Sequence, residues 1–320
     1  MTLNFDKQNR NVTEVDLSIL QMTRDFVQLG RKKGHPIHYT VINQIRKMCE
    51  KALNGSQYTV NLSKLWITPQ GGVHLKDMPN LDPQHPAAYL IERVYCRIDL
   101  NHASDTEKNM AIGILFNENG YNVAFGVNVR ECTNFTVYGD NFYSTYKSGK
   151  KANHEAIMEL LQKWISEIDV KRDWYFKLVE ALKSINFTTE RVKEICGDLL
   201  QLAVARNHRY KDIESGLDQT QVAQLALKAY EEREKVSVTA WEMLNWGTEM
   251  LKPKSADLKD LQADIVDFNN FFIRNYAGLT PEMFGAVAEE VKALELQFEE
   301  ANVTEDPNDN LEGTGTNLAQ

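Results

Sequence analysis

The chain of 320 residues has few cysteines, and they are widely spaced. Cys49, Cys96, Cys132 and Cys196 form no CxxC pair. Thiols scattered in this way are typical of a reducing compartment and argue against a disulfide framework. Cys96 and Cys132 lie in strand-like runs, where we expect them to be small buried hydrophobic residues.

Long apolar runs are missing as well. No stretch approaches the roughly 20 apolar residues that cross a bilayer. The first residues, Met-Thr-Leu-Asn-Phe-Asp-Lys, have neither an apolar signal core nor a basic amphipathic presequence. We therefore expect a soluble cytoplasmic protein with no membrane partner.

The sequence also lacks the common motifs of nucleotide and hydrolase sites, namely GxxxxGK[ST], GxGxxG, HExxH and GxSxG. His35 and His38 are the one close pair among seven histidines. No cysteine or carboxylate set stands near them, so we expect surface histidines and no metal site.

One carboxylate cluster is the main candidate for chemistry. Asp99, Asp105 and Glu107 surround His102 near the end of a predicted strand. A magnesium-assisted nuclease could use such a group. A polar loop between strands explains it equally, and we favour the loop. We expect no enzyme activity, no metal and no cofactor.

The net charge of −9 is unevenly distributed. Residues 1–150 carry 17 basic and 14 acidic residues, and residues 151–280 carry 18 and 21. Residues 281–320 carry one lysine against ten acids. The deficit therefore lies in the C-terminal 40 residues, and the N-terminal half is mildly basic.

The hydrophobic periodicity predicts an α+β fold. A helix is indicated over 40–53, and two-residue alternation then runs from 58 to 138, with hairpin turns at 69–72 and 117–120. The rest is helical, with predicted helices at 152–168, 172–184, 189–205, 219–232, 240–251, 256–275 and 281–300. We expect an N-terminal antiparallel β-meander with flanking helices (1–150), a helical region (151–300) and a disordered acidic tail (301–320).

Residues 135–151 interleave aromatic residues with lysines. Single-stranded nucleic acid is held by aromatic faces that stack on bases and by cations that follow the phosphates. The predicted nucleic-acid-binding residues are Tyr138, Phe142, Tyr143 and Tyr146 for stacking, and Arg130, Lys147, Lys150 and Lys151 for phosphates. The alternative is that Phe135, Phe142 and Tyr146 pack the sheet against the first long helix.

Three segments carry a family resemblance. Residues 116–140, with an aromatic-Gly strand followed by Cys132-Thr-Asn, are similar to the core of an uncharacterised family of phage- and plasmid-borne proteins of Bacteroidetes mobile elements. Residues 187–195 and 238–248 resemble two later family segments in the same order, although Trp246 and Gly247 depart from the usual spelling. The family has no established catalytic residues. The resemblance implies a virus or mobile element, and DNA metabolism or a contest with the host.

The element order of residues 40–170 is also similar to that of single-strand annealing proteins of the Redβ/RecT kind. We therefore expect a phage or mobile-element protein of the host cytoplasm that binds or anneals single-stranded DNA in recombination. We expect it to form a homo-oligomer and to use no nucleotide cofactor. The alternative is an anti-defence effector whose acidic C-terminal region imitates DNA and binds a host or phage protein.

Overall fold

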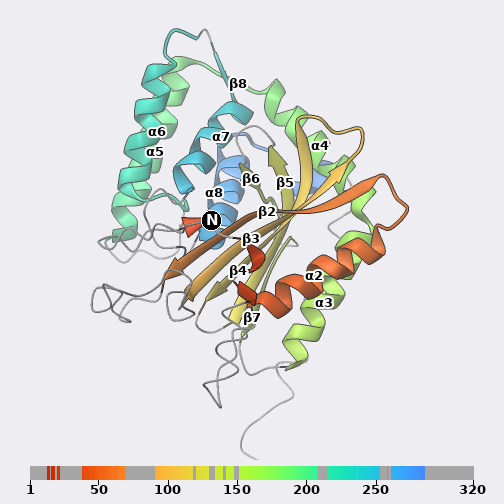
Figure 1. Ribbon diagram of the computed structural model, residues 1–320. Helices are drawn as coiled ribbons and strands as arrows, with labels where there is room; N and C mark the ends of the chain where they lie inside the picture. Colours follow the sequence, from red (N-terminus) through yellow and green to blue (C-terminus); the bar gives the residue numbers. More distant parts are fainter. Residues whose placement is uncertain are drawn as a thin grey trace, which may run out of the picture.

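A twisted antiparallel sheet lies at the centre of the molecule, with helices on both of its faces (Figure 1). The computed structural model describes residues 13–14, 16–18, 20–21, 38–69, 91–117, 120–129, 134–139, 142–147, 151–207, 215–235, 237–252, 258 and 261–284. All structural statements below concern these residues.

The sheet follows the order β1-β2-β3-β4-β5-β6, and β7 also pairs with β5. Every pairing is antiparallel. Short connections join β3, β4 and β5, so consecutive strands are neighbours, as in a meander. The strands are β1 (Thr13–Glu14), β2 (Tyr58–Pro69), β3 (Ile91–His102), β4 (Lys108–Asn117), β5 (Gly120–Val129), β6 (Phe135–Thr136) and β7 (Tyr143–Lys147).

One face of the sheet is apolar and forms the larger core. Helices α2 (His38–Ala52), α3 (Lys151–Ser166) and α4 (Ile168–Ser184) pack against it. Phe116 meets the ring of His38 from α2, and Phe125 meets Trp164 from α3 with ring centroids 5.5 Å apart. Burial of such aromatic rings is a major stabilising term. We call this side the apolar face.

The opposite face carries small and polar side chains, because alternate residues of a strand point to opposite sides. Helix α8 (Leu261–Asn275) covers one end of this polar face. Gln262 on α8 donates from Nε2 to the carbonyl of Gly113 at 3.3 Å. A side chain at position 113 would press on the Phe135 ring, so glycine permits this close approach.

The remaining helices stack beyond α8. They are α5 (Thr189–Asn207), α6 (Gln219–Glu231) and α7 (Ala240–Leu251), with a small ladder between β8 (Asn186–Phe187) and β9 (Val238–Thr239). Two of them begin at complete capping boxes, Asp218 with Gln221 and Thr239 with Glu242. Each box satisfies two backbone N–H groups that a helix start leaves open. A 3-10 turn, η4 (Pro281–Phe284), follows α8.

The α+β prediction is confirmed, and several predicted elements match closely. The predicted helix at 240–251 coincides with α7, and the turn at 117–120 joins β4 to β5. Residues 58–69 form one long strand, β2, and the turn and return strand predicted after it lie outside the described residues. The helix predicted beyond residue 284 and the acidic tail also lie outside them. The hydrophobic core is continuous across residue 150, the expected domain boundary.

Candidate functional site

A groove of about 520 Å³ opens on the uncovered end of the polar face. This volume is within the usual range for ligand sites. The described side chains that line it are all polar, and they come from four neighbouring strands. The groove residues are Thr59, Asn61, Ser63 and Lys64 from β2, Arg97, Asp99 and Asn101 from β3, Asn109 from β4 and Asn128 from β5.

A β-bulge shapes one wall of the groove. Leu62 pairs with Ile98 and Lys64 pairs with Arg97, so Ser63 is an extra residue in β2. Because a bulge shifts the alternation by one, Ser63 and Lys64 both lie opposite Arg97. Ser63 Oγ accepts a hydrogen bond from Arg97 Nε at 3.1 Å. The bulge thus supplies a hydroxyl beside the arginine.

The groove floor is a connected polar network. Arg97 Nε donates to Asp99 Oδ1 at 2.9 Å, and the two side chains are 3% and 10% exposed. Asn128 Nδ2 donates to Asn109 Oδ1 at 3.2 Å and, more weakly, to Asp99 Oδ2 at 3.5 Å. These bonds fix the side chains before any ligand arrives, which lowers the entropic cost of binding.

An aromatic pair adjoins the groove next to Arg97. A smaller cavity lined by Trp66, Tyr95 and Lys252 shares this arginine with the groove. Trp66 and Tyr95 stack across β2 and β3 with centroids 5.3 Å apart. The asparagine amides, Arg97 and the Trp66–Tyr95 pair are therefore neighbours on the same face of the sheet.

Two predicted stacking residues belong to the core and not to an open surface. Tyr138 is 0% exposed and Phe142 is 2% exposed. The Phe142 ring lies among Phe125, Trp174 and Tyr175, with the Tyr175 centroid 5.3 Å away. These rings leave no face for a base, so the assignment of Tyr138 and Phe142 to stacking is wrong for this conformation. The packing alternative accounts for Phe142, which also meets Trp164 of α3, whereas Phe135 is buried on the polar face, beside Gly113 and under α8.

The other predicted residues that the structure describes lie on β7 and at the start of α3. Tyr143 is half-buried against the core and pairs with Ala124 in the ladder of β7 with β5. Tyr146 and Lys147 pair with Tyr121 and Gly120 in the same ladder. Lys151 begins α3. Arg130 and Lys150 lie outside the described residues.

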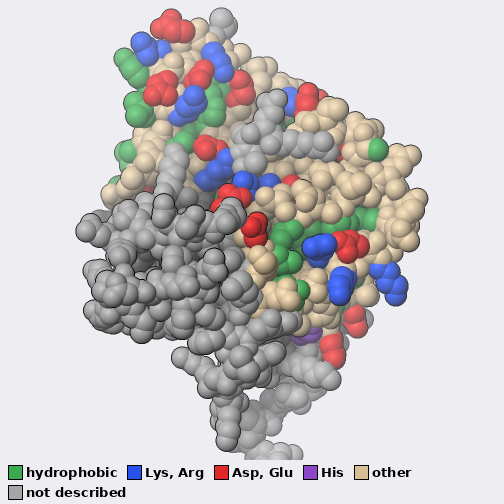
Figure 2. Space-filling view, in the orientation of Figure 1, with side chains coloured by type: hydrophobic (Ala, Val, Ile, Leu, Met, Phe, Trp, Pro, Cys, Tyr) green, Lys and Arg blue, Asp and Glu red, His purple; other side chains and the backbone are tan. Residues whose placement is uncertain are grey.

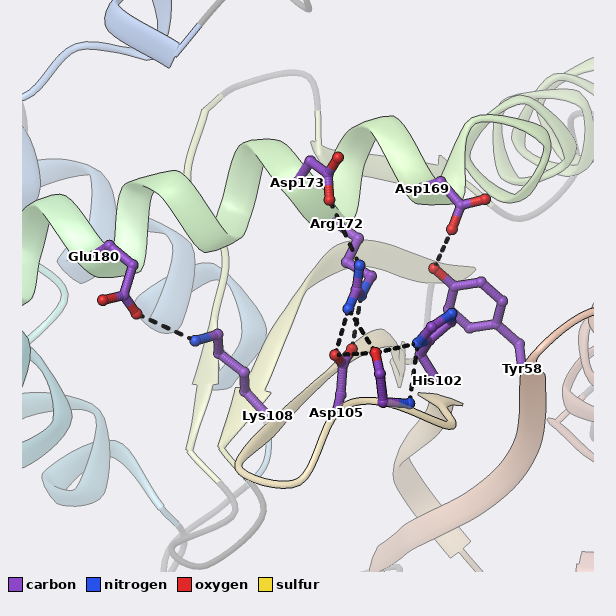
Figure 3. A network of polar contacts seen from close by, with 9 residues as sticks. Tyr58, His102, Asp105, Lys108, Asp169, Arg172, Asp173 and Glu180 are labelled. Carbon is purple, nitrogen blue, oxygen red and sulfur yellow. Dashed lines mark hydrogen bonds and ion pairs between the residues drawn. The ribbon is translucent and has the colours of Figure 1, made fainter.

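The carboxylate cluster is divided between the two faces of the sheet. Asp99 lines the groove, whereas His102 packs edge-on against Tyr58 on the apolar side. Asp105 is held by Arg172 of α4, whose Nε donates to Oδ2 at 2.7 Å (Figure 3). Tyr58 donates to Asp169 of the same helix at 2.7 Å. Asp105 lies in a polar loop between strands, as the favoured interpretation expects, and this loop anchors α4.

Other candidate groups in the described residues also serve packing. The His38 ring sits against Phe116, and this burial lowers the pKa of His38 to about 4. Cys96 is 0% exposed, as predicted, and Cys132 lies outside the described part. Within that part, no three or more His, Cys, Asp or Glu side chains are grouped to hold a metal ion. None of its helices is both long and apolar enough to cross a membrane.

A second surface stands out on the helical hairpin of α5 and α6. Leu200 and Val204 of α5 and Leu227 and Tyr230 of α6 are between 39% and 61% exposed. Apolar side chains gather there among charged ones, at the upper left of the molecule (Figure 2). A cluster of exposed apolar residues is typical of a protein contact.

Sequence reasoning missed the groove, although a signal was present. Asn61, Asp99 and Asn128 each occupy the polar phase of a predicted strand, and Asn109 lies just before one. Their convergence depends on strand register, which alternation alone does not give. Searches of protein-family models, curated proteins and solved structures found no significant match to this chain, so its function is inferred from this geometry.

Proposed function

We propose that the protein binds single-stranded DNA without catalysing a reaction on it, and that the strand lies along the polar face of the sheet. The observation that supports this is the continuity of groove and aromatic pair at Arg97. Single-strand sites combine a cationic track for the backbone with aromatic side chains for the bases. Lys64 and Arg97 provide the cations, and the half-buried Trp66, which stacks on the buried Tyr95, provides the aromatic surface.

The proposal moves the binding site away from residues 135–151. It keeps the function expected from sequence, and it replaces Tyr138 and Phe142 as stacking residues by the half-buried Trp66. We also propose that the protein acts in a phage or mobile element, and this part is supported by the family resemblance alone.

The charge of the groove sets the expected strength of the interaction. Lys64 pairs with Glu14 at 3.2 Å, and Arg97 pairs with Asp99. On DNA binding, phosphates would replace Glu14 and Asp99 as the partners of Lys64 and Arg97. Because both cations are already paired in the free protein, we expect few counterions to be released. For single strands each phosphate contact contributes about 0.7 to the salt slope. Two contacts predict a shallow slope of about 1.4, and hydrogen bonds to bases must supply much of the affinity.

The first prediction tests this with fluorescence anisotropy on a labelled 20-nucleotide oligothymidine at 25–200 mM salt. Lys64→Gln should weaken binding and reduce the slope of log Kd against log salt by about 0.7. Lys177→Gln is the matched control, because Lys177 is exposed on α4, which packs against the apolar face. It should change neither quantity.

Absence of binding at the lowest salt would refute the proposal. Equal effects of Lys64→Gln and Lys177→Gln would show that DNA binds elsewhere. Either result would favour the second candidate function, an effector that binds protein. The exposed apolar residues of α5 and α6 support that alternative. The acidic C-terminal region that it also invokes lies outside the described residues.

A further inference from the structure

The groove floor contains a buried acceptor that the protein leaves unused. Asn128 is 1% exposed, and its Oδ1 has no hydrogen-bond partner within the described residues. Its Nδ2 is committed to Asn109 and Asp99. Turning the amide over would bring Oδ1 against the oxygens of those two residues, so the network fixes the oxygen as the free atom.

A buried acceptor without a donor is costly, and a ligand that supplies the donor recovers this cost. Asn122 is a useful comparison, because it has the same unpartnered amide oxygen as Asn128 but lies outside the groove. It also lies on β5 and is 6% exposed. Of these two amides, only Asn128 belongs to a residue that lines the groove within the described part of the chain.

Asp99 adds further acceptors beside Asn128. Its carboxylate accepts from Arg97 and Asn128, and a carboxylate offers about four acceptor positions. Asp99 pairs with Ala111 and Asn128 pairs with Asn109, so the two residues lie on either side of β4. The groove floor therefore presents two neighbouring acceptor groups, the Asp99 carboxylate and the Asn128 amide oxygen.

Among the four bases of DNA, guanine carries the matching donors. Its N1–H and N2 amine lie side by side on one edge. Thymine offers a single N–H between two carbonyl oxygens, and adenine and cytosine offer one amine beside an acceptor nitrogen. Single-stranded bases are commonly read on this edge. We infer that Asp99 and Asn128 form a subsite for a guanine base, an inference that rests on the proposed binding of single-stranded DNA.

The test compares oligothymidines that carry one central dG, dI or dT, in anisotropy titrations at fixed salt. Two neighbouring hydrogen bonds predict about tenfold tighter binding of the dG strand than of the dT strand. Inosine keeps N1–H and lacks the N2 amine, so the dI strand should lie between them. This comparison uses the unaltered protein and does not depend on the folding of any variant.

Variants assign the preference to residues. Asn128→Ala and the isosteric Asp99→Asn should each reduce the ratio of dG-strand to dT-strand affinity at least threefold. Asn122→Ala, the matched control, should retain the full preference. Thermal melting of each variant identifies any that fail to fold.

The outcomes separate the two proposals. Equal binding of the dG, dI and dT strands overturns the guanine subsite and leaves the binding of single-stranded DNA standing. A dG preference that Asn122→Ala abolishes and Asn128→Ala retains also overturns it. Failure of every strand to bind overturns both.

Discussion

At the scale of single residues, Arg172 joins α4 to the loop between β3 and β4. It contacts Asp105 through two of its nitrogens and Ser104 through Nη2 at 3.2 Å (Figure 3). Burial by itself would raise the pKa of the Asp105 carboxyl. The hydrogen bonds and charge of Arg172 outweigh burial, so the pKa lies below its ordinary value.

The second prediction follows from this pair. Asp105→Asn should lower the free energy of unfolding by about 2 kcal/mol at pH 7, because it removes a charged hydrogen bond from a nearly buried arginine. Urea denaturation monitored by circular dichroism measures this difference. Asp173→Asn is the control, since Asp173 also pairs with Arg172 at 3.5 Å but its side chain is 69% exposed. An exposed pair of this kind contributes little.

The same pair predicts a dependence on pH. A carboxyl whose pKa is depressed by folding adds stability that is complete above its unfolded pKa, about 3.9. That stability disappears as the pH falls through the lower folded pKa. The difference between the wild type and Asp105→Asn should therefore be full at pH 7 and shrink below about pH 4. A difference that grew on acidification would contradict the ion-pair explanation.

Individual residues also show what sequence can predict of a site. Phe142 has the neighbours expected of a stacking residue, and nothing in its local pattern reveals that Trp174 and Tyr175 of α4 will cover it. Asn128 looks like an ordinary solvent-facing strand residue. Its role depends on Asn109 and Asp99, which are 19 and 29 positions away. Local composition selects residue types, whereas contacts across strands decide their exposure.

At the scale of elements, α7 and α8 are packed closely enough that a glycine is required between them. A Cβ at Gly247 would run into the ring of Phe268 on α8. On α5, by contrast, a Cβ at Gly197 would meet no atom within 4 Å. Both glycines are helical, so they share the same intrinsic penalty relative to alanine.

The third prediction uses these two glycines as a matched pair. Gly197→Ala should raise the free energy of unfolding by about 0.5–1 kcal/mol through helix propensity. Gly247→Ala should lower it by roughly 1–3 kcal/mol, because overpacking outweighs the same gain. Thermal and urea unfolding measure both changes. Stabilisation by Gly247→Ala would show that the Phe268 ring leaves room for a Cβ at position 247.

Periodicity predicted most elements because each depends on a local pattern. The helices and the β4–β5 hairpin follow from spacing, capping residues and a turn. In β2 the aliphatic residues fall on even positions up to Leu62 and on odd positions from Leu65, and Leu65 and Ile67 are buried. Such a shift suggests two strands, and only the pairing with β3 shows one strand with a bulge.

At the scale of the whole molecule, sheet and helices share one hydrophobic core. Helices from the C-terminal half pack on both faces of a sheet built by the N-terminal half. Phe125 on β5 contacts Trp164 on α3, and Asn134 donates to the carbonyl of Asn245 on α7 at 2.9 Å. Neither half can complete this core without the other.

The fourth prediction is that the chain unfolds as one cooperative unit. Far-ultraviolet circular dichroism, which follows the helices, and tryptophan fluorescence should give coincident urea transitions. The residue 1–150 fragment alone should lack a cooperative transition. Two separated transitions, or a fragment that folds, would show that the halves are independent domains.

The bulge at Ser63 has a consequence for the behaviour of the protein in concentrated solution. Within the described residues, β1 pairs with the outer side of β2 only at Trp66 and Ile67, so much of that strand is a sheet edge. Unpaired edges recruit other chains and start aggregation. Ser63, the extra residue, interrupts the regular row of backbone N–H and C=O groups along β2. The charge on Lys64 disfavours pairing with an apolar strand of another molecule. The irregularity that helps to form the groove thus also protects the edge beside it from pairing with a second sheet.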